Sequence, residues 1–267
     1  MKTWSEGVLL HTSDARGVHH WVLNDPARFN VLSDEMLMAL EQATAAVAAD
    51  EGARVVVISA QGKAFCAGHD LKAMARVTDQ AQHQALFKHC TRMMLGLMRL
   101  NVPVVAQVHA IATAAGCQLV AQCDLAVAAD TAQFGVNGID IGLFCSTPSV
   151  ALTRNVGIKA AMEMLCTGEF IDAAEAKRRG LVNRVCAPDA LDPSVETLVA
   201  AILSKPKSAL AMGKALVYEQ REAPMAAAYQ MAGEVMALNM MHADAQEGAQ
   251  AFVNKRVPAW RDAGGQA

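Results

Sequence analysis

Two loops of small residues carry the chemistry that this sequence suggests most directly. Residues 61–72 (QGKAFCAGHDLK) and 110–119 (AIATAAGCQL) each follow an apolar run typical of a buried strand, and each precedes a helical pattern. Small side chains let a ligand approach the main chain, whose N–H groups can then donate to an anion or a polarised carbonyl. On neighbouring parallel strands the two loops would converge their amides on one oxygen, as in an oxyanion hole. The alternative is a pair of ordinary strand-to-helix crossovers.

Four side chains in or near these loops are candidates for further chemistry. His69 can titrate near neutral pH beside the first loop, although a histidine satisfied by hydrogen bonds is the alternative. Gln118 can orient a water molecule but cannot shuttle a proton at ordinary pH. Cys145 and Ser146 are nucleophile types without an obvious paired base, so packing or capping is the alternative for both.

The elements that must position these residues alternate between strands and helices over the first two-thirds of the chain. Apolar runs predict strands at 8–12, 18–23, 54–59, 103–108 and 124–128. Ser33 offers an N-cap for a helix that continues to residue 49, and residues 80–100 form a long amphipathic pattern. This alternation predicts α/β layers around a parallel sheet. Helical patterns dominate from residue 147 onward, so we expect a helical C-terminal part.

The composition argues against several classes of protein. Of the 267 residues, 53% are hydrophobic and 18% are charged, which excludes intrinsic disorder. A net charge of −3 and 4% aromatic residues argue against nucleic acid as a partner. The seven cysteines form no Cys-x-x-Cys pair, so no metal or redox site is signalled. The first residues lack an apolar signal segment, and polar residues interrupt the uncharged stretch 101–123, so we expect a cytoplasmic protein without membrane contact.

Several motifs resemble those of the enoyl-CoA hydratase/isomerase (crotonase) family, and the resemblance covers nearly the whole chain. The most specific pair is AFCAGHDLK at 64–72 and EGAQAFVNKR at 247–256. Further matching stretches lie at 23–32, 112–124, 167–169 and 172–185. Residues 69–70, 113–118 and 142–148 are most similar to the subgroup of enoyl-CoA hydratase domain-containing protein 3.

This resemblance implies a crotonase fold of repeated ββα units. It divides the chain into an α/β core over 1–200 and a helical C-terminal trimerisation part over 201–267. It also implies an acyl-CoA thioester as ligand, with no metal and no cofactor beyond the coenzyme A of the substrate. Trimers or hexamers are the usual assemblies of the family, and lyase or isomerase activity in fatty acid metabolism is its usual function.

The resemblance also assigns roles to individual positions. The oxyanion-hole donors would be the backbone N–H groups of His69 and Ala115. Seven residues match positions that line the binding site for the CoA part of the ligand: Ala27, Arg28, Ala67, Asp70, Leu71, Phe252 and Lys255. Phe252 and Lys255 match C-terminal residues that often reach the CoA of a neighbouring subunit. Surface scaffolding is the alternative for each of the seven.

The sequence departs from the family at the positions of acid/base chemistry. Hydration needs one group that takes a proton and one that gives it, and Gln118 and Gly138 stand where the family carries two glutamates. Asp140 lies two residues past the second position, where an extended chain would aim it at the opposite face. Ser146 stands where some family isomerases carry an aspartate.

Three hypotheses about function remain compatible with these residues. The first is an acyl-CoA thioester enzyme of the hydratase/isomerase family with an oxyanion hole and atypical acid/base residues. The second is a CoA-thioester-binding protein without hydratase activity, which the replacements at Gln118 and Gly138 favour. The third is a thioester hydrolase that uses Ser146 or Cys145.

Overall fold

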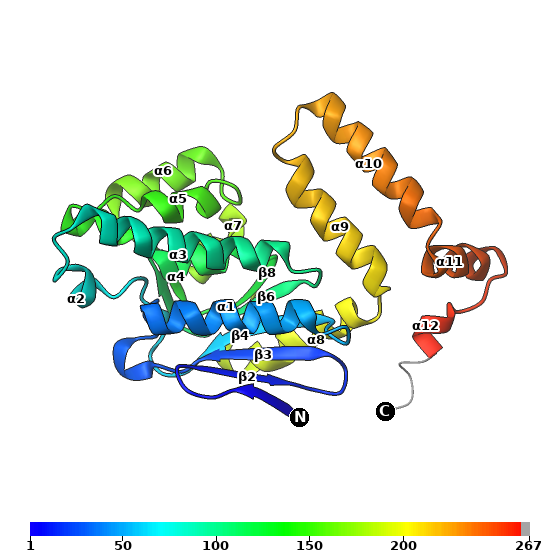
Figure 1. Cartoon of the computed structure of the whole chain (residues 1–267), viewed down its shortest axis with the longest axis horizontal. Helices are drawn as coiled ribbons and strands as arrows, with labels where there is room; N and C mark the ends of the chain where they lie inside the picture. Colours follow the sequence, from blue (N-terminus) through cyan, green and yellow to red (C-terminus); the bar gives the residue numbers. More distant parts are fainter. Residues whose placement is uncertain (263–267) are drawn as a thin grey trace.

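The computed structural model describes residues 1–262 and is built around a seven-stranded sheet (Figure 1). The strands of this sheet are, in spatial order, β1 Lys2–Ser5, β2 Leu9–Ser13, β3 Val18–Leu23, β4 Val55–Ala60, β6 Val104–Val108, β8 Leu125–Ala129 and β11 Arg184–Cys186. The first three strands pair antiparallel, and β3 through β11 run parallel. The expected α/β class with a parallel sheet is confirmed.

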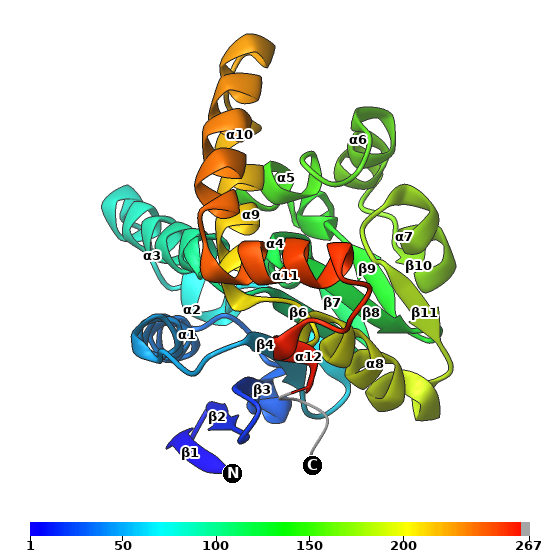
Figure 2. The same ribbon diagram turned by 90° about the vertical axis from the view of Figure 1, so that its right-hand side faces the viewer.

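The central strands are covered on both faces by helices, as Figure 2 shows. Residues 55–58 of β4 are all buried, and such continuous apolar runs are typical of strands without a solvent face. Alternate side chains of β4 join two different clusters. One cluster includes α1 (Asp34–Ala49) and α3 (Gln80–Arg99), and the other includes α8 (Leu191–Leu203).

A second, four-stranded sheet lies next to the first and was not predicted from the sequence. Its strands are, in spatial order, β10 Ile171–Asp172, β9 Gln133–Gly135, β7 Ile111–Thr113 and β5 Ala64–Cys66. Strands of two or three residues are too short for an alternating pattern to be visible. Because β5, β7 and β9 each follow a strand of the large sheet and precede a helix, they complete the repeated ββα units expected of the crotonase fold.

The remaining helices follow these strands in chain order. They are η1 Pro26–Arg28, α2 Leu71–Met74, α4 Ala115–Gln122, η2 Asn137–Ile141, α5 Ser146–Leu152, α6 Ile158–Thr167, α7 Ala173–Arg179, η3 Pro188–Ala190, α9 Lys207–Gln220, α10 Met225–Met240, α11 Ala243–Val253 and α12 Ala259–Asp262. Ser33 caps α1 as expected, because its Oγ accepts the Met36 N–H. Within residues 1–262, no helix is long and apolar enough to cross a bilayer.

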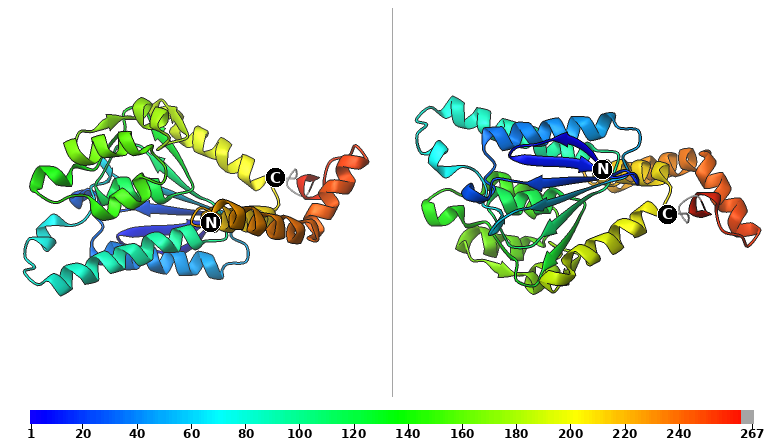
Figure 3. Two further views of the ribbon diagram at one scale, coloured as in Figure 1. Left: turned by 90° about the horizontal axis from the view of Figure 1, so that it is seen from above. Right: turned by 90° about the horizontal axis from the view of Figure 1, so that it is seen from below.

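Helices α9 to α11 extend away from the core as a C-terminal arm over residues 207–253 (Figures 1 and 3). A buried ion pair holds the arm at its base: Lys214 Nζ lies 2.7 Å from Asp124 Oδ2, and Tyr218 donates its hydroxyl hydrogen to Asp124 Oδ1 at 2.7 Å. Asp124 therefore has a structural role. The division of the chain near residue 200 stays a prediction, and residues 263–267 of the expected C-terminal part lie outside the described residues.

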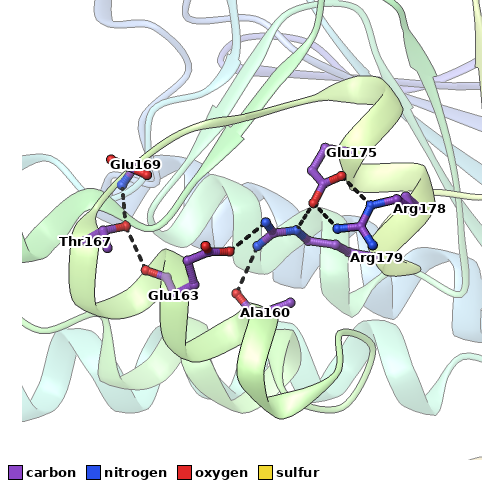
Figure 4. Close-up of polar contacts among 7 residues, drawn as sticks. All are labelled: Ala160, Glu163, Thr167, Glu169, Glu175, Arg178 and Arg179. Carbon is purple, nitrogen blue, oxygen red and sulfur yellow. Dashed lines mark hydrogen bonds and ion pairs between the residues drawn. The ribbon is translucent and has the colours of Figure 1, made fainter.

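An ion-pair network joins α6 to α7 on the side of the molecule that carries β10 (Figure 4). Glu175 accepts hydrogen bonds from Arg178 and Arg179, which hold the pKa of its carboxyl at about 2. Arg179 also lies 2.7 Å from Glu163 and donates to the Ala160 carbonyl at the start of α6. The arginine is therefore satisfied by partners on both helices, and the cluster is structural.

Candidate active site

A cavity of about 270 Å³ lies where the two loops of small residues meet. Its wall comes from five parts of the chain: Ala67, His69, Leu71 and Met74; Phe87; Thr113, Ala114 and Ala115; Asn137, Gly138, Ile141, Leu143 and Phe144; and Cys145, Ser146, Thr147 and Pro148. A larger surface hollow of about 640 Å³ between α1, α2 and α3 borders the cavity and shares Met74 with it. The smaller cavity is the candidate site, because both loops line it.

Two glycines allow the loops to touch. A Cβ on Gly68 would lie 3.1 Å from the Ala115 nitrogen, and a Cβ on Gly116 would lie 2.1 Å from the Cys66 carbonyl oxygen. Gly68 also has a φ of +89°, which side chains rarely tolerate. The parallel pairing of β5 with β7, with Cys66 opposite Ala112, sets this close approach. The His69 and Ala115 backbones are therefore neighbours on the cavity wall.

The turn into α4 is strained at Ala114, whose φ is 50° and whose ψ is −120°. A residue other than glycine pays about 1–3 kcal/mol for such a conformation, and such outliers cluster at functional sites. The Ala114 N–H donates to the Gly135 carbonyl at 2.9 Å, which fixes the turn. The following residue, Ala115, opens α4, where a helix offers no acceptor for its N–H and carries a partial positive charge.

The first loop is fixed in a similar way. The Leu32 N–H donates to the Gly68 carbonyl at 2.7 Å, and Leu32 and His69 form a parallel bridge. The His69 ring lies edge-on to Phe87 of α3, with ring centroids 5.7 Å apart. Burial lowers the pKa of His69 below 6.5, so the ring is neutral at pH 7. Its Nε2 is buried and has no hydrogen-bond partner among the described residues.

The structure does not bring the side chains of the other acid/base candidates, Gln118 and Asp140, to the wall of the cavity. Gln118 is only 6% exposed and, within residues 1–262, its Oε1 has no hydrogen-bond partner. Asp140 is exposed, and its Oδ1 would lie 2.8 Å from a Cβ placed on Gly168. Neither side chain belongs to the described cavity wall, whereas Gly138 does.

Gly138 is glycine because the chain folds tightly around it. A Cβ there would lie 2.3 Å from the Leu143 carbonyl oxygen and 2.9 Å from Cys145 Sγ. The Asn-Gly pair suggests a positive φ at Gly138, but Gly138 is not among the glycines with positive φ. A glutamate is therefore blocked by a close backbone approach rather than by the torsion angle.

The two candidate nucleophiles, Cys145 and Ser146, line the cavity without a base beside them. Cys145 Sγ accepts the Gly138 N–H at 3.3 Å, and burial raises the pKa of this thiol, which disfavours the thiolate. Ser146 Oγ donates to the Phe144 carbonyl at 3.3 Å. Among the described residues, no histidine or carboxylate hydrogen-bonds to either group. The geometry favours packing and local hydrogen bonding over a hydrolase mechanism.

Five of the seven positions assigned to the CoA part lie in three places. Ala67 and Leu71 line the cavity, and Asp70 caps α2 by accepting the Ala73 N–H at 3.0 Å. Arg28, which follows Ala27 in the exposed η1, lies 2.7 Å from Asp25, 3.7 Å from Asp70 and 3.9 Å from Glu35.

Phe252 lies in α11, and Lys255 lies just after it. This helix is at the opposite end of the molecule from α2 (Figures 1 and 3). Phe252 is 86% exposed. Neither residue belongs to the described wall of the cavity, which Ala67 and Leu71 line.

Sequence reasoning missed two polar residues of the cavity wall, Thr113 and Asn137. Thr113 ends β7, and Asn137 follows β9, which pairs with β7 in parallel. Ligands of parallel sheets bind at the carboxyl ends of the strands, so polar residues just after neighbouring strands would have been the signal. That signal was hidden because β7 and β9 were not recognised as strands.

Comparisons with known proteins agree with this geometry. The sequence profile of the family described as enoyl-CoA hydratase/isomerase matches residues 14–263. The chain is 42% identical over 256 residues to the mitochondrial enoyl-CoA hydratase domain-containing protein 3 of Rattus norvegicus, covering 96% of this chain and 85% of that protein. The human protein of the same name is 40% identical over 244 residues, covering 91% of this chain and 80% of that protein.

Two solved structures share the fold over nearly the full length. The crystal structure of an enoyl-CoA hydratase from Mycobacterium smegmatis superposes with a TM-score of 0.94 at 56% identity, covering 96% of this chain and 99% of that one. The crystal structure of human enoyl-CoA hydratase domain-containing protein 3 superposes with a TM-score of 0.91 at 38% identity, covering 95% and 100%. The chain belongs to the enoyl-CoA hydratase/isomerase family.

Proposed function

We propose that this protein binds acyl-CoA thioesters in the cavity and polarises the thioester carbonyl with the backbone N–H groups of His69 and Ala115. The observation that carries this proposal is the close approach of the two loops, in which even a Cβ on Gly68 would lie only 3.1 Å from the Ala115 nitrogen. The strained turn at Ala114 supports it, because it presents the first N–H of α4 at the cavity.

Stabilisation of an enolate-like oxygen is the chemistry that these donors supply. A thioester carbonyl gains negative charge on its oxygen when a proton leaves the neighbouring carbon or when a nucleophile adds at the β-carbon. One such donor typically contributes ~10²–10³ in rate. Lyase or isomerase chemistry on an acyl-CoA therefore fits the site, with coenzyme A entering as part of the substrate and no metal or redox cofactor required.

Water addition is the part of the family chemistry that these residues support least. Each general acid or base typically contributes ~10²–10⁴ in rate, and Gln118 can act as neither. Gly138 has no side chain, and the backbone around it leaves no room for one. We therefore propose that hydration of crotonyl-CoA is slow in this protein. The second candidate function, thioester binding without hydration, rests on this geometry.

Replacement of Ala115 by proline tests the oxyanion assignment. Proline at the first position of a helix is tolerated, and it removes the N–H of that position. We expect wild-type protein to bind butyryl-CoA with about micromolar affinity in calorimetry, and Ala115→Pro to lose most of that affinity. Ala115→Gly is the matched control, because it keeps the N–H. Equal affinities for wild type and Ala115→Pro, with both folded by circular dichroism, would rule out this donor.

Turnover of crotonyl-CoA, followed by the loss of enoyl absorbance, separates the two candidate functions. Binding with hydration near the buffer background supports a thioester-binding protein or a different reaction of the same site. A robust hydratase rate that is insensitive to His69→Ala and Asp140→Asn would show that an acid/base pair exists elsewhere in the cavity.

A further inference from the structure

The N-terminal strand β1 is the outermost strand of the large sheet (Figure 2), and it covers a buried pair of histidines. His11 of β2 is 1% exposed and His19 of β3 is 0% exposed, and His11 Nε2 lies 2.8 Å from His19 Nδ1. The Trp4 indole of β1 stacks on the His11 ring, with centroids 5.5 Å apart and an interplanar angle of 14°. Its centroid is also 5.5 Å from that of the His19 ring. One side chain of β1 therefore lies over both histidines.

The hydrogen bonds of the pair fix where its protons lie. Burial lowers the pKa of His19, although Asp50 opposes the shift, so the ring is neutral at pH 7. His19 Nε2 lies 3.1 Å from Asp50 Oδ2, and a carboxylate only accepts, so Nε2 carries the hydrogen. His19 Nδ1 must then accept the hydrogen of His11 Nε2. His11 Nδ1 has no hydrogen-bond partner among residues 1–262, so an added proton goes there.

A positive charge on His11 cannot be hydrated while β1 is in place. Lys2 Nζ already lies over the Trp4 ring, 3.3 Å from its centroid, so the new charge would meet a like charge nearby. Burial, followed by the neighbouring His19 and Lys2, lowers the pKa of His11 to about 4. When β1 moves away, water reaches the ring and its pKa returns toward 6.5. Proton uptake at pH 4 therefore favours the displaced form of β1 by roughly a hundredfold.

The other elements around the pair offer no charge that would hold this proton in the closed form. Within the described chain, no carboxylate acts on His11. Asp50, at the C-terminal end of α1, acts on His19 and is already bonded to it. His20 alternates to the opposite face of β3 and, like Lys2, lowers the pKa of His19. The strand β4, which lies beyond β3, carries no titratable side chain.

β1 is also the strand of the large sheet that is held by the fewest backbone contacts on its flanks. Within residues 1–262 it pairs only with β2, and this pairing is irregular between Thr3 and Ser5. Trp4 adds one further bond, from its Nε1–H to Ser13 Oγ at 2.8 Å. Terminal segments with few contacts open locally at low free-energy cost. Its departure would leave β2 as the edge strand, with unpaired N–H and C=O groups.

We infer that β1 is an acid-released edge strand: protonation of His11 displaces Trp4, β1 leaves the sheet, and β2 becomes its open edge while the rest of the fold persists. None of the residues involved belongs to the described wall of the cavity, so this release is separate from the thioester site proposed above.

Fluorine NMR of the full chain labelled with 5-fluorotryptophan tests this inference. The chain has three tryptophans, Trp4, Trp21 and Trp260, and single replacements by phenylalanine assign their signals. Between pH 7.5 and pH 4, the Trp4 signal should move reversibly to the position of a solvent-exposed indole. Trp21 is 0% exposed and lies edge-on to His11 in the core, so its signal should remain that of a buried indole. A release that spares Trp21 is local.

His11→Gln is the decisive variant, because the glutamine amide can donate to His19 Nδ1 but does not titrate. The Trp4 signal of this variant should keep its pH 7.5 position down to pH 4. His20→Gln is the matched control, since it removes the adjacent histidine of β3, whose pKa is also lowered by burial. This control should release Trp4 at nearly the wild-type pH. If His11→Gln shows no folded Trp21 signal, His11→Asn takes its place.

Three results would overturn the inference. A Trp4 signal that stays unchanged down to pH 4, with Trp21 folded, would show that β1 keeps its place. Movement of the Trp4 and Trp21 signals together would show that acid unfolds the whole chain rather than its edge. Release of Trp4 at the wild-type pH in the folded His11 variant would show that a different group takes up the proton.

Discussion

At the scale of single residues, Gly138 shows how the backbone limits the chemistry of the cavity. The family glutamate that would stand here needs a Cβ, and that atom would lie 2.3 Å from the Leu143 carbonyl oxygen. An attempt to restore hydration with Gln118→Glu and Gly138→Glu must therefore move the 143–145 segment as well. The absence of a side chain at position 138 is tied to the local path of the chain.

The first prediction concerns that clash. Gly138→Glu should lower the melting temperature by several degrees, because the Leu143 carbonyl oxygen and Cys145 Sγ, 2.3 and 2.9 Å from the new Cβ, must move. The double variant with Gln118→Glu should gain little hydratase activity. Gly157→Glu is the matched control, since a Cβ at Gly157 meets nothing within 4 Å. Differential scanning calorimetry of both variants, together with crotonyl-CoA turnover, measures the effect. An unchanged melting temperature with restored turnover would show that the site accommodates the glutamate.

The second prediction concerns a histidine pair at the β2–β3 hairpin. His11 Nε2 lies 2.8 Å from His19 Nδ1, and His19 Nε2 lies 3.1 Å from Asp50. Burial, followed by the neighbouring His19, lowers the pKa of His11 from 6.5 to about 4. The unfolded chain therefore binds a proton more readily than the folded one. The stability that depends on neutral His11 is complete above pH 6.5 and is lost as the pH falls through 4.

Melting temperatures measured from pH 7.5 to pH 4 test this linkage. We expect the wild type to lose stability across that window and His11→Asn, which keeps a short polar group without a titrating ring, to lose less. Identical pH profiles for the two proteins would show that His11 does not contribute to the pH dependence of stability. The position of the pair on β2 and β3, away from the cavity, predicts that thioester binding does not follow the same profile.

At the scale of elements, the third prediction concerns how the C-terminal arm is joined to the core. Lys214 of α9 donates to the Leu97 and Val102 carbonyls, at 3.0 and 2.9 Å, and pairs with Asp124. Its side chain is only 7% exposed. Removing one partner of a buried ion pair leaves the other uncompensated and costs about 3–5 kcal/mol. Lys214→Met should therefore destabilise the protein by about that amount.

Chemical denaturation measures this cost, and Lys205→Met provides the control at an exposed lysine before α9. We expect the control to change the free energy of unfolding by less than about 0.5 kcal/mol. If Lys214→Met changed the free energy of unfolding equally little, the arm would be held by its apolar contacts rather than by the ion pair. Hydrogen exchange of α9 would then show unchanged protection.

At the scale of the whole molecule, the C-terminal arm exposes many large apolar side chains. Its most exposed large apolar side chains are Met225, Tyr229, Met236, Leu238, Met241, Phe252 and Val253, each at least 64% exposed. Large apolar side chains exposed in such number on one segment favour an interaction site there. We propose that it packs against further copies of this chain in a trimer or hexamer, which would also place Phe252 and Lys255 near another copy's cavity.

The fourth prediction is the mass in solution. Light scattering at micromolar concentration should give three or six times the chain mass of 28.3 kDa. The double variant Tyr229→Lys and Met236→Lys should shift the distribution toward monomer, because charges in a closed interface lose their hydration. A wild-type monomer would contradict the assembly.

A cytoplasmic location for the protein stays a prediction, and the relatives from rat and human are named mitochondrial.

Much of this protein follows from local sequence alone. Apolar runs such as Val55–Ile58 predict the buried parallel strands, because a strand covered on both faces needs no polar alternation. Ser33 predicts the start of α1 through its capping oxygen. The motifs at 64–72 and 247–256 identify the family, and the fold follows from it.

Only the tertiary structure decided what lies around the cavity. The pairing of β5, β7 and β9 depends on contacts between strands of three residues, which leave no periodic signal in the sequence. That pairing presses Gly68 against Ala115 and joins Thr113 to Asn137. The burial that lowers the pKa of His69 and the position of Gln118 outside the described wall are likewise set by the tertiary structure. These are distances between residues far apart in the chain, and no local pattern of residue types encodes them.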